Sequence, residues 1–243
     1  MTTLLEVDGL TKRFGGVTAV DACSFSVPTG SVTALVGPNG SGKTTAFNLI
    51  TGYSRRDDGV IRFDGNSVRA PDPTRLARRG LTRTFQQARV FADLTLVENM
   101  VAALQQPWRS AFRSAVRPNE RARALELLDE FGLARLAGER AGNLSYGQKK
   151  LLEFAAVLMG EPKLVLLDEP TAGVNPVLVE QIEARIRELN ARGLTFLLVE
   201  HNMNLVMRLC DPVVVLDHGT KLAEGRPDEV RTDARVLDAY LGG

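Results

Sequence analysis

A glycine-rich loop carries the first recognisable chemistry in this 243-residue chain. Residues 37–44 read Gly-Pro-Asn-Gly-Ser-Gly-Lys-Thr; an apolar run at 32–36 precedes them and is typical of a buried parallel strand, and residues 43–50 favour a helix. Such a loop points backbone N–H groups inward at the positive end of a helix, which is an arrangement that binds phosphate. Lys43 would reach the β- and γ-phosphates of a nucleotide, and the Thr44 hydroxyl would bind Mg²⁺. The alternative, a strand–helix turn without a ligand, leaves the Lys-Thr pair unexplained. The predicted nucleotide contacts are Gly37, Pro38, Asn39, Gly40, Ser41, Gly42, Lys43, Thr44 and Thr45.

Two adjacent acids, Asp168 and Glu169, follow a second apolar run at residues 164–167. The carboxyl end of a central strand is where open α/β sheets bind ligands. Asp168 would hold Mg²⁺, usually through water, and Glu169 would polarise an attacking water molecule. The alternative is that both acids only end a strand and cap the turn at Pro170. Together with the phosphate loop, the acids favour nucleotide hydrolysis.

A short segment, Leu-Ser-Tyr-Gly-Gln at residues 144–148, precedes a helix-favouring run at 149–159. Ser145 with Gln148 three residues later is typical of a capping box at a helix start. A serine hydroxyl, a glycine and the unpaired N–H groups of a helix end can also bind an anion. From the residues alone, a purely structural cap and an anion site both remain open.

In their order and spacing the three segments resemble the ATP-binding cassette of ABC transporters, and the resemblance runs from Phe14 to the C-terminus. It implies ATP and Mg²⁺ as cofactors, and a second cassette as partner, with residues 145–148 (Ser145, Tyr146, Gly147 and Gln148) facing the γ-phosphate bound by that partner. Tyr146 departs from the commoner Leu-Ser-Gly-Gly-Gln form. Asn175 stands where many cassettes have Asp, so the contact between subunits made there is expected to differ.

The resemblance also implies three smaller sites. Phe14 would stack on adenine, with Val20 supporting the ring, although an isolated Phe in a β-rich segment is more often part of the core. Gln86 would sense Mg²⁺ and the γ-phosphate, with Gln87 as the alternative. His201, after an apolar run at 194–199, would hold the γ-phosphate and orient water. The predicted catalytic residues are therefore Glu169, His201 and Gln86, and the predicted Mg²⁺ ligands are Thr44, Gln86 and Asp168.

Composition agrees with an ATPase that does not itself enter a membrane. Hydrophobic residues make up 44% of the chain, yet no apolar run approaches the ~18 residues that span a bilayer. The first residues lack the charged and apolar regions of a secretory signal. Cys23 and Cys210 form no metal or redox spacing, and a net charge of +1 argues against a nucleic-acid partner. We expect a cytoplasmic protein, peripheral on the inner face of the cell membrane.

The pattern along the chain predicts an α/β fold in one domain, residues 1–243. Residues up to about 27 alternate as β-strands do, and strands alternating with helices then indicate a parallel sheet. The resemblance implies a P-loop ABC ATPase with a RecA-like parallel-sheet core, an N-terminal antiparallel β-subdomain and an inserted helical subdomain. The core and β-subdomain would take about 1–87 and 156–243, and the helical subdomain about 88–155. Within the latter we expect a helix at 120–131, and a basic face that is solvated or near lipid headgroups (Trp108, Arg109, Arg113 and Arg117).

Details of the sequence look like one branch of the family, the ATP-binding subunits of branched-chain amino acid importers. They are Phe-Gly-Gly at 14–16, Phe-Asn-Leu-Ile-Thr-Gly at 47–52, Arg-Thr-Phe-Gln at 83–86, Glu-His-Asn-Met at 200–203 and Ala-Tyr-Leu-Gly at 239–242. This branch implies membrane permease subunits, docking near residues 88–98, and a solute-binding protein. The alternatives are the ATPase of a lipopolysaccharide exporter and a soluble ABC ATPase of iron–sulfur assembly. After His201 we expect only a short strand pair and a tail.

Overall fold

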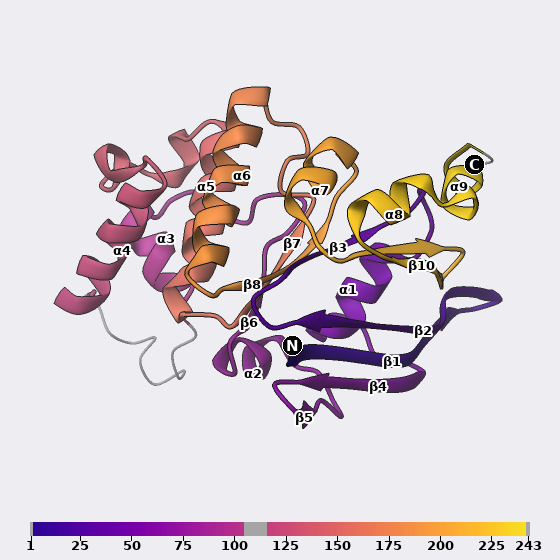
Figure 1. Cartoon of the computed structure of the whole chain (residues 1–243). Helices are drawn as coiled ribbons and strands as arrows, with labels where there is room; N and C mark the ends of the chain where they lie inside the picture. Colours follow the sequence, from indigo (N-terminus) through magenta and orange to yellow (C-terminus); the bar gives the residue numbers. More distant parts are fainter. Residues whose placement is uncertain (1, 105–115, 242–243) are drawn as a thin grey trace.

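The computed structural model describes residues 2–104 and 116–241 and contains two β-sheets (Figure 1). The first is antiparallel, in the order β2-β1-β4-β5, and the second has the order β10-β9-β3-β8-β7-β6. In the second sheet β3 pairs in parallel with β8 and β9, β7 pairs in parallel with β6 and β8, and β10 is antiparallel to β9. The predicted fold class is confirmed. The strands are β1 (Thr3–Phe14), β2 (Val17–Pro28), β3 (Val32–Val36), β4 (Asp58–Phe63), β5 (Asn66–Ser67), β6 (Leu81–Arg83), β7 (Leu164–Asp168), β8 (Thr195–Val199), β9 (Val213–Asp217) and β10 (Thr220–Gly225).

The helices form groups that can be followed in Figure 1. Helices α3, α4 and α5 pack on one another at the end of the molecule remote from the antiparallel sheet, while α1 lies between the two sheets. The three grouped helices lie in the stretch predicted to be a helical subdomain, about 88–155, except that α5 ends two residues later, at Val157. The helices are α1 (Lys43–Thr51), α2 (Pro73–Arg78), α3 (Leu96–Ala102), α4 (Pro118–Glu130), α5 (Tyr146–Val157), α6 (Pro176–Ala191), α7 (Met203–Leu209), α8 (Pro227–Thr232) and α9 (Ala234–Leu241).

The central sheet is buried on both faces, and its side chains alternate between two cores. Val165 and Leu167 of β7 face the core shared with α3, α4, α5 and α6, whereas Leu164 and Leu166 face the core shared with α1 and the antiparallel sheet. A strand buried on both faces reads as a continuous apolar run, which is why the sequence identified β3, β7 and β8. Their carboxyl ends lie at one edge, where the phosphate loop and the acids follow.

The C-terminal region differs from the expected strand pair and tail. Three short helices, α7, α8 and α9, accompany β9 and β10. Asn202 caps α7 by accepting a hydrogen bond from the Leu205 N–H at 3.2 Å. Helices α7 and α8 have only seven and six residues, too few to show a clear apolar period, so tertiary packing rather than local pattern decides them.

Among the described residues, no helix combines the length and the apolar character needed to cross a membrane. Three members of the predicted basic face, Trp108, Arg109 and Arg113, lie outside the described residues. The fourth, Arg117, lies before α4 and pairs with Glu120 at 3.8 Å.

Candidate ATP site

The loop between β3 and α1 requires glycine at two positions. A Cβ atom on Gly37 would lie 2.1 Å from the Leu216 carbonyl oxygen, and one on Gly42 would lie 2.4 Å from the Ala19 carbonyl oxygen. Gly42 also has a φ of +99°, in the region that disfavours side chains. Strands β2 and β9 therefore hold the loop closely from both sides, and substitution at either glycine would displace it.

Lys43 lies buried within this loop. Its ammonium donates to the carbonyl oxygens of Gly37 at 2.9 Å and Pro38 at 2.8 Å, and to the Ser41 hydroxyl at 3.2 Å. Burial lowers the pKa of Lys43, while the nearby charge of Glu169 opposes that change. The positive charge is thus held at the centre of the loop, and Thr44, the next residue, is exposed.

The two residues predicted to contact adenine differ in their surroundings. Phe14, at the end of β1, is 52% exposed, and the Lys12 ammonium lies 5.2 Å from its ring centre. It is therefore a surface aromatic rather than a core residue. Val20 is fully buried beneath the loop, 3.5 Å from the place a Gly42 Cβ would take. Val20 therefore lies against the loop, and its support of the adenine ring remains a prediction.

Glu169 joins the other two predicted catalytic residues. The Gln86 amide donates to its Oε2 at 2.8 Å, and His201 Nε2 lies 2.8 Å from its Oε1. Between Gln86 and Gln87, the structure thus places Gln86 at the acid. Glu169 has a φ of +48°, a strained value for a residue with a side chain, and its N–H donates to the Val199 carbonyl at 2.9 Å. Two side chains therefore hold the carboxylate, and β8 holds the backbone that carries it.

Asp168 is held by a residue that the sequence did not reveal. The Arg83 guanidinium at the end of β6 pairs with its Oδ2 at 2.5 Å, and both side chains are only 5% and 6% exposed. Arg83 also donates to Asn48 Oδ1 at 2.7 Å and Thr51 Oγ1 at 3.1 Å, both on α1. The sequence signal that could have indicated this pair is an arginine within a short strand of the core, because a buried arginine needs an acidic partner. Arg83 therefore links the acid to the helix that begins at the phosphate loop.

The residues predicted to bind Mg²⁺ offer suitable atoms. Thr44 supplies a hydroxyl, Asp168 a carboxylate, and Gln86 an amide whose nitrogen is engaged with Glu169, which leaves its oxygen as the ligand. Magnesium prefers hard oxygen ligands and commonly binds one or two carboxylates together with substrate phosphates. The donor set therefore fits this ion.

Glu200, which sequence reasoning left without a role, organises the backbone around His201. The carboxylate is buried and accepts hydrogen bonds from the N–H and hydroxyl of Thr171, at 3.0 and 2.7 Å, and from the N–H groups of His201 and Asn202. It joins the segment after Glu169 to the segment after β8. A hollow of about 570 Å³ opens beside Glu169 and His201.

Residues 145–148 form the predicted capping box at the start of α5. Ser145 Oγ accepts from the Gln148 N–H at 3.3 Å, and Gln148 Oε1 accepts from the Ser145 N–H at 2.9 Å. Tyr146 is exposed, and a Cβ on Gly147 would lie 2.5 Å from Leu178 Cδ2. The first turn of α5 therefore presents its amide end on the surface.

Asn175 has a local role in the helix that follows the acids. Its side chain caps α6 by accepting from the Leu178 N–H at 2.9 Å. This hydrogen bond fixes the orientation of the Asn175 side chain, so any contact with a second subunit would be made in that orientation.

The segment predicted to meet a permease lies between Gln86 and α3. The Arg89 guanidinium lies 3.6 Å from the centre of the Phe85 ring, and Phe91 is exposed. Glu98 instead belongs to the capping box of α3, where it accepts from the Thr95 N–H at 2.7 Å. Arg89 is therefore the better probe of this surface, because a change at Glu98 would also disturb α3.

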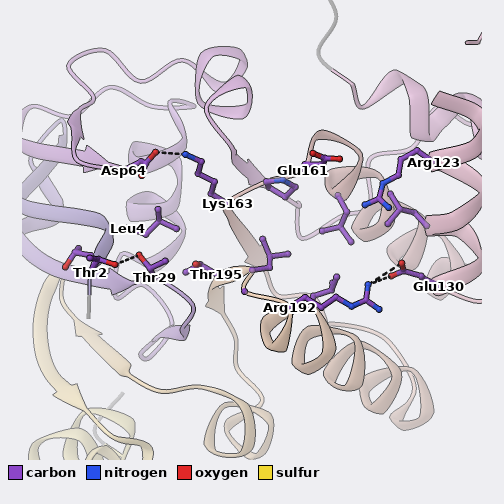
Figure 2. A pocket seen from close by; sticks show the side chains of 17 residues that line it. Thr2, Leu4, Thr29, Asp64, Arg123, Glu130, Glu161, Lys163, Arg192 and Thr195 are labelled. Carbon is purple, nitrogen blue, oxygen red and sulfur yellow. Dashed lines mark hydrogen bonds and ion pairs between the residues drawn. The ribbon is translucent and has the colours of Figure 1, made fainter. Parts of the chain in front are cut away.

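A second hollow, of about 700 Å³, lies at the opposite ends of β7 and β8 (Figure 2). Ion pairs between Lys163 and Asp64 at 2.6 Å, and between Arg192 and Glu130 at 3.4 Å, cross its wall. It contains none of the predicted site residues.

Comparisons with known proteins agree with this geometry. The family model described as ABC transporter matches residues 20–172, and a model described as branched-chain amino acid ATP-binding cassette transporter matches residues 220–243. The chain is 40% identical to the high-affinity branched-chain amino acid transport ATP-binding protein BraF of Pseudomonas aeruginosa, and 37% identical to LivG, of the same description, from Escherichia coli strain K12; each match covers 98% of both chains.

Solved structures show the same likeness. A nucleotide-free ATP-binding cassette from an ABC transporter superposes with a TM-score of 0.90 at 34% identity, and an ATP-binding cassette of an ABC transporter in its ADP conformation does so with 0.90 at 35%; both cover 100% of each chain. The chain belongs to the ABC transporter family, as an ATP-binding, ATP-hydrolysing cassette of the branch described as branched-chain amino acid transport proteins.

Proposed function

We propose that this cassette hydrolyses ATP to drive import of branched-chain or related amino acids through a membrane permease. The observation that carries the chemistry is the fixed carboxylate of Glu169, held by Gln86 and His201 and placed directly after Asp168. The names of the relatives support the solute class. The C-terminal family match over residues 220–243 favours the importer branch over the exporter and iron–sulfur alternatives.

In this proposal ATP lies on the phosphate loop with adenine against Phe14. Lys43 exchanges its loop carbonyl partners for the β- and γ-phosphates, since charge-assisted contacts to phosphate are stronger than those to neutral carbonyls. Thr44, Asp168 and Gln86 would hold Mg²⁺, which neutralises phosphate charge when bound. Arg83 orients the Asp168 carboxylate from behind.

Glu169 then accepts a proton from, or orients, the attacking water. Its Oε1 faces His201 and its Oε2 faces Gln86, so water that enters beside the γ-phosphate meets an oriented acceptor. The strained backbone at Glu169 and the four hydrogen bonds accepted by Glu200 keep this geometry fixed.

A second cassette completes the site through the first turn of its own α5. There the N–H groups, the Ser145 hydroxyl and Gly147 meet the γ-phosphate. The pair, formed with itself or a sister subunit, sits on the cytoplasmic face of the membrane beneath permease subunits that dock on residues 88–98. A solute-binding protein delivers the amino acid on the other side.

The test uses Glu169→Gln, which keeps the shape of the side chain but removes the acceptor and slows hydrolysis by roughly 10²–10⁴-fold. With ATP this variant should elute as a pair in size-exclusion chromatography, either alone or mixed with its sister cassette. Adding Ser145→Arg should abolish the pair, because the larger side chain cannot fit against the γ-phosphate. Adding Ser145→Asp, which retains the helix cap, should abolish it by charge repulsion.

The matched control adds Ser67→Arg, a change of equal bulk and charge at an exposed position in β5, and should leave the pair intact. A Glu169→Gln protein that remains monomeric with ATP in every mixture would refute the proposed pairing.

A further inference from the structure

Lys150 is a buried cation on the helix that begins with residues 145–148. Its side chain is 5% exposed and lies one turn beyond Ser145. The ammonium donates to the main-chain carbonyl of Gln86 at 2.5 Å and to that of Glu169 at 3.3 Å. One side chain of α5 therefore binds the backbone of both Gln86 and Glu169, whose side chains contact each other.

The positive charge of Lys150 is stabilised by nearby carboxylates. Burial lowers its pKa, and the carboxylates of Glu153, Asp168, Glu200 and Glu169 oppose that change. Four carboxylates thus lie near enough to act on one ammonium. Because an unpaired buried charge is costly, removing the ammonium would allow these carboxylates to repel one another and move.

Glu153, three residues later on the same face of α5, binds the other side of the same segment. Its Oε1 accepts from the N–H of Phe85 at 3.1 Å and from the N–H of Arg89 at 3.4 Å. The side chain is 7% exposed. Lys150 and Glu153 therefore both bind the main chain around Gln86. Lys150 donates to the carbonyl oxygen of Gln86, and Glu153 accepts from N–H groups on either side of it.

We infer that Lys150 and Glu153 are positioning residues that couple the two ATP sites of a cassette pair. The inference rests on the proposed function, in which the first turn of α5 meets the partner's γ-phosphate. The helix that senses the partner's nucleotide at Ser145 holds Gln86 and Glu169 of its own site about one turn further along, through Lys150. A displacement of α5 on partner binding must then be passed to the catalytic carboxylate, because these contacts are direct hydrogen bonds within a packed core.

This role predicts a pattern that simple loss of packing would not give. Lys150→Met keeps the length and apolar stem of the side chain but removes the charge and the donors. We expect ATP affinity of the isolated chain to stay within about twofold, because no phosphate contact is lost. We expect kcat to fall by about tenfold to a hundredfold, because a misplaced catalytic group costs that order of rate. Cooperativity in ATP should disappear, with a Hill coefficient of ~1.

The experiment measures hydrolysis against ATP concentration for the full chain, alone and with its sister cassette, and nucleotide binding at concentrations where the chain is monomeric. Lys150→Arg, which restores charge and donors, should recover at least part of the rate. Lys149→Met, beside it on α5 with its ammonium on the Gly142 carbonyl, should behave as the parent does. If Lys150→Met does not fold, Lys150→Gln retains a donor and takes its place.

Two results would overturn the inference. One is parental kcat and cooperativity in Lys150→Met; the other is loss of ATP affinity in step with rate, which would indicate a general structural role. The pairing assay with Glu169→Gln separates this inference from the proposed function. If Glu169→Gln alone forms no ATP-dependent pair, the proposed function fails and the coupling fails with it. If the pair forms and Lys150→Met leaves turnover unchanged, only the coupling fails.

Discussion

Replacing Glu153 with Gln should change how the stability of this protein depends on pH. Burial raises the pKa of Glu153 from its ordinary value of 4.5 to about 7, although N–H groups of Phe85 and Arg89 and the charges of Lys150 and Arg89 oppose the rise. The folded protein therefore holds a proton on Glu153 at pH values where the unfolded chain has lost it. Gln keeps the shape and the acceptor oxygen but cannot ionise.

The sign and size of the effect follow from that difference. Below pH 4.5 both states are protonated and the contribution of Glu153 is fully present; it is lost as the pH rises through about 7. Raising a pKa from 4.5 to about 7 corresponds to about 3 kcal/mol, since each pKa unit is worth about 1.4 kcal/mol. The free energy of unfolding of the parent, minus that of Glu153→Gln, should therefore fall by up to about 3 kcal/mol between pH 4.5 and pH 8.

Urea unfolding of both proteins at half-unit pH steps measures this difference, and all other titrating groups cancel. Glu98→Gln is the control, because hydrogen bonds from the Thr95 N–H and hydroxyl lower the pKa of Glu98. Its contribution is present above the ordinary value of 4.5 and is lost as pH falls, so its difference curve should stay nearly flat from pH 4.5 to pH 8 and should decline only below pH 4.5. A parent-minus-variant difference that stays flat from pH 4.5 to pH 8 would show that Glu153 titrates normally, and the burial argument would be wrong.

Two further substitutions test the nucleotide site. Lys43→Ala should weaken ATP binding by about tenfold to a hundredfold, the value of one or more charge-assisted hydrogen bonds, and abolish hydrolysis; a nucleotide titration that returned the parental affinity would refute the phosphate-loop assignment. Arg83→Met should lower the free energy of unfolding by about 3–5 kcal/mol, because it leaves Asp168 buried without its partner. Arg62→Met, which breaks the exposed pair with Glu6, should cost less than about 1 kcal/mol in the same urea experiment, and equal losses in the two variants would contradict the argument from burial.

The parts of the fold and site that could be predicted are those with local causes. The strand, loop and helix around Lys43 follow from a short apolar run, glycines and a helix start, all within about twenty residues. The capping box of Ser145 and Gln148 depends on residues three apart, and the structure contains both of its hydrogen bonds. Helix α8 has only six residues, too few for an apolar period to show, and its packing against β9 and β10 decides it.

The partners of the predicted residues were harder to foresee, because they come from distant parts of the chain. Arg83 meets Asp168 across 85 positions, and Lys150 meets Gln86 across 64. Sequence patterns give the strand or helix on which a residue lies, but pairing across elements depends on strand order. Strand β6 lies beside β7 in the sheet, although the helices α3, α4 and α5 separate the two strands in the sequence.

Helix α5 nevertheless contained a usable signal. Six consecutive residues, 150–155, are buried, so the helix is surrounded on all sides rather than along one stripe. The sequence Leu-Leu-Glu-Phe-Ala-Ala-Val-Leu-Met after Lys150 already has apolar residues on every face. In such a helix a lysine and a glutamate cannot both find water, and a buried charge must be paired or hydrogen-bonded. Their presence therefore implied fixed partners inside the protein, and the structure supplies these partners from the segments that carry Gln86 and Glu169.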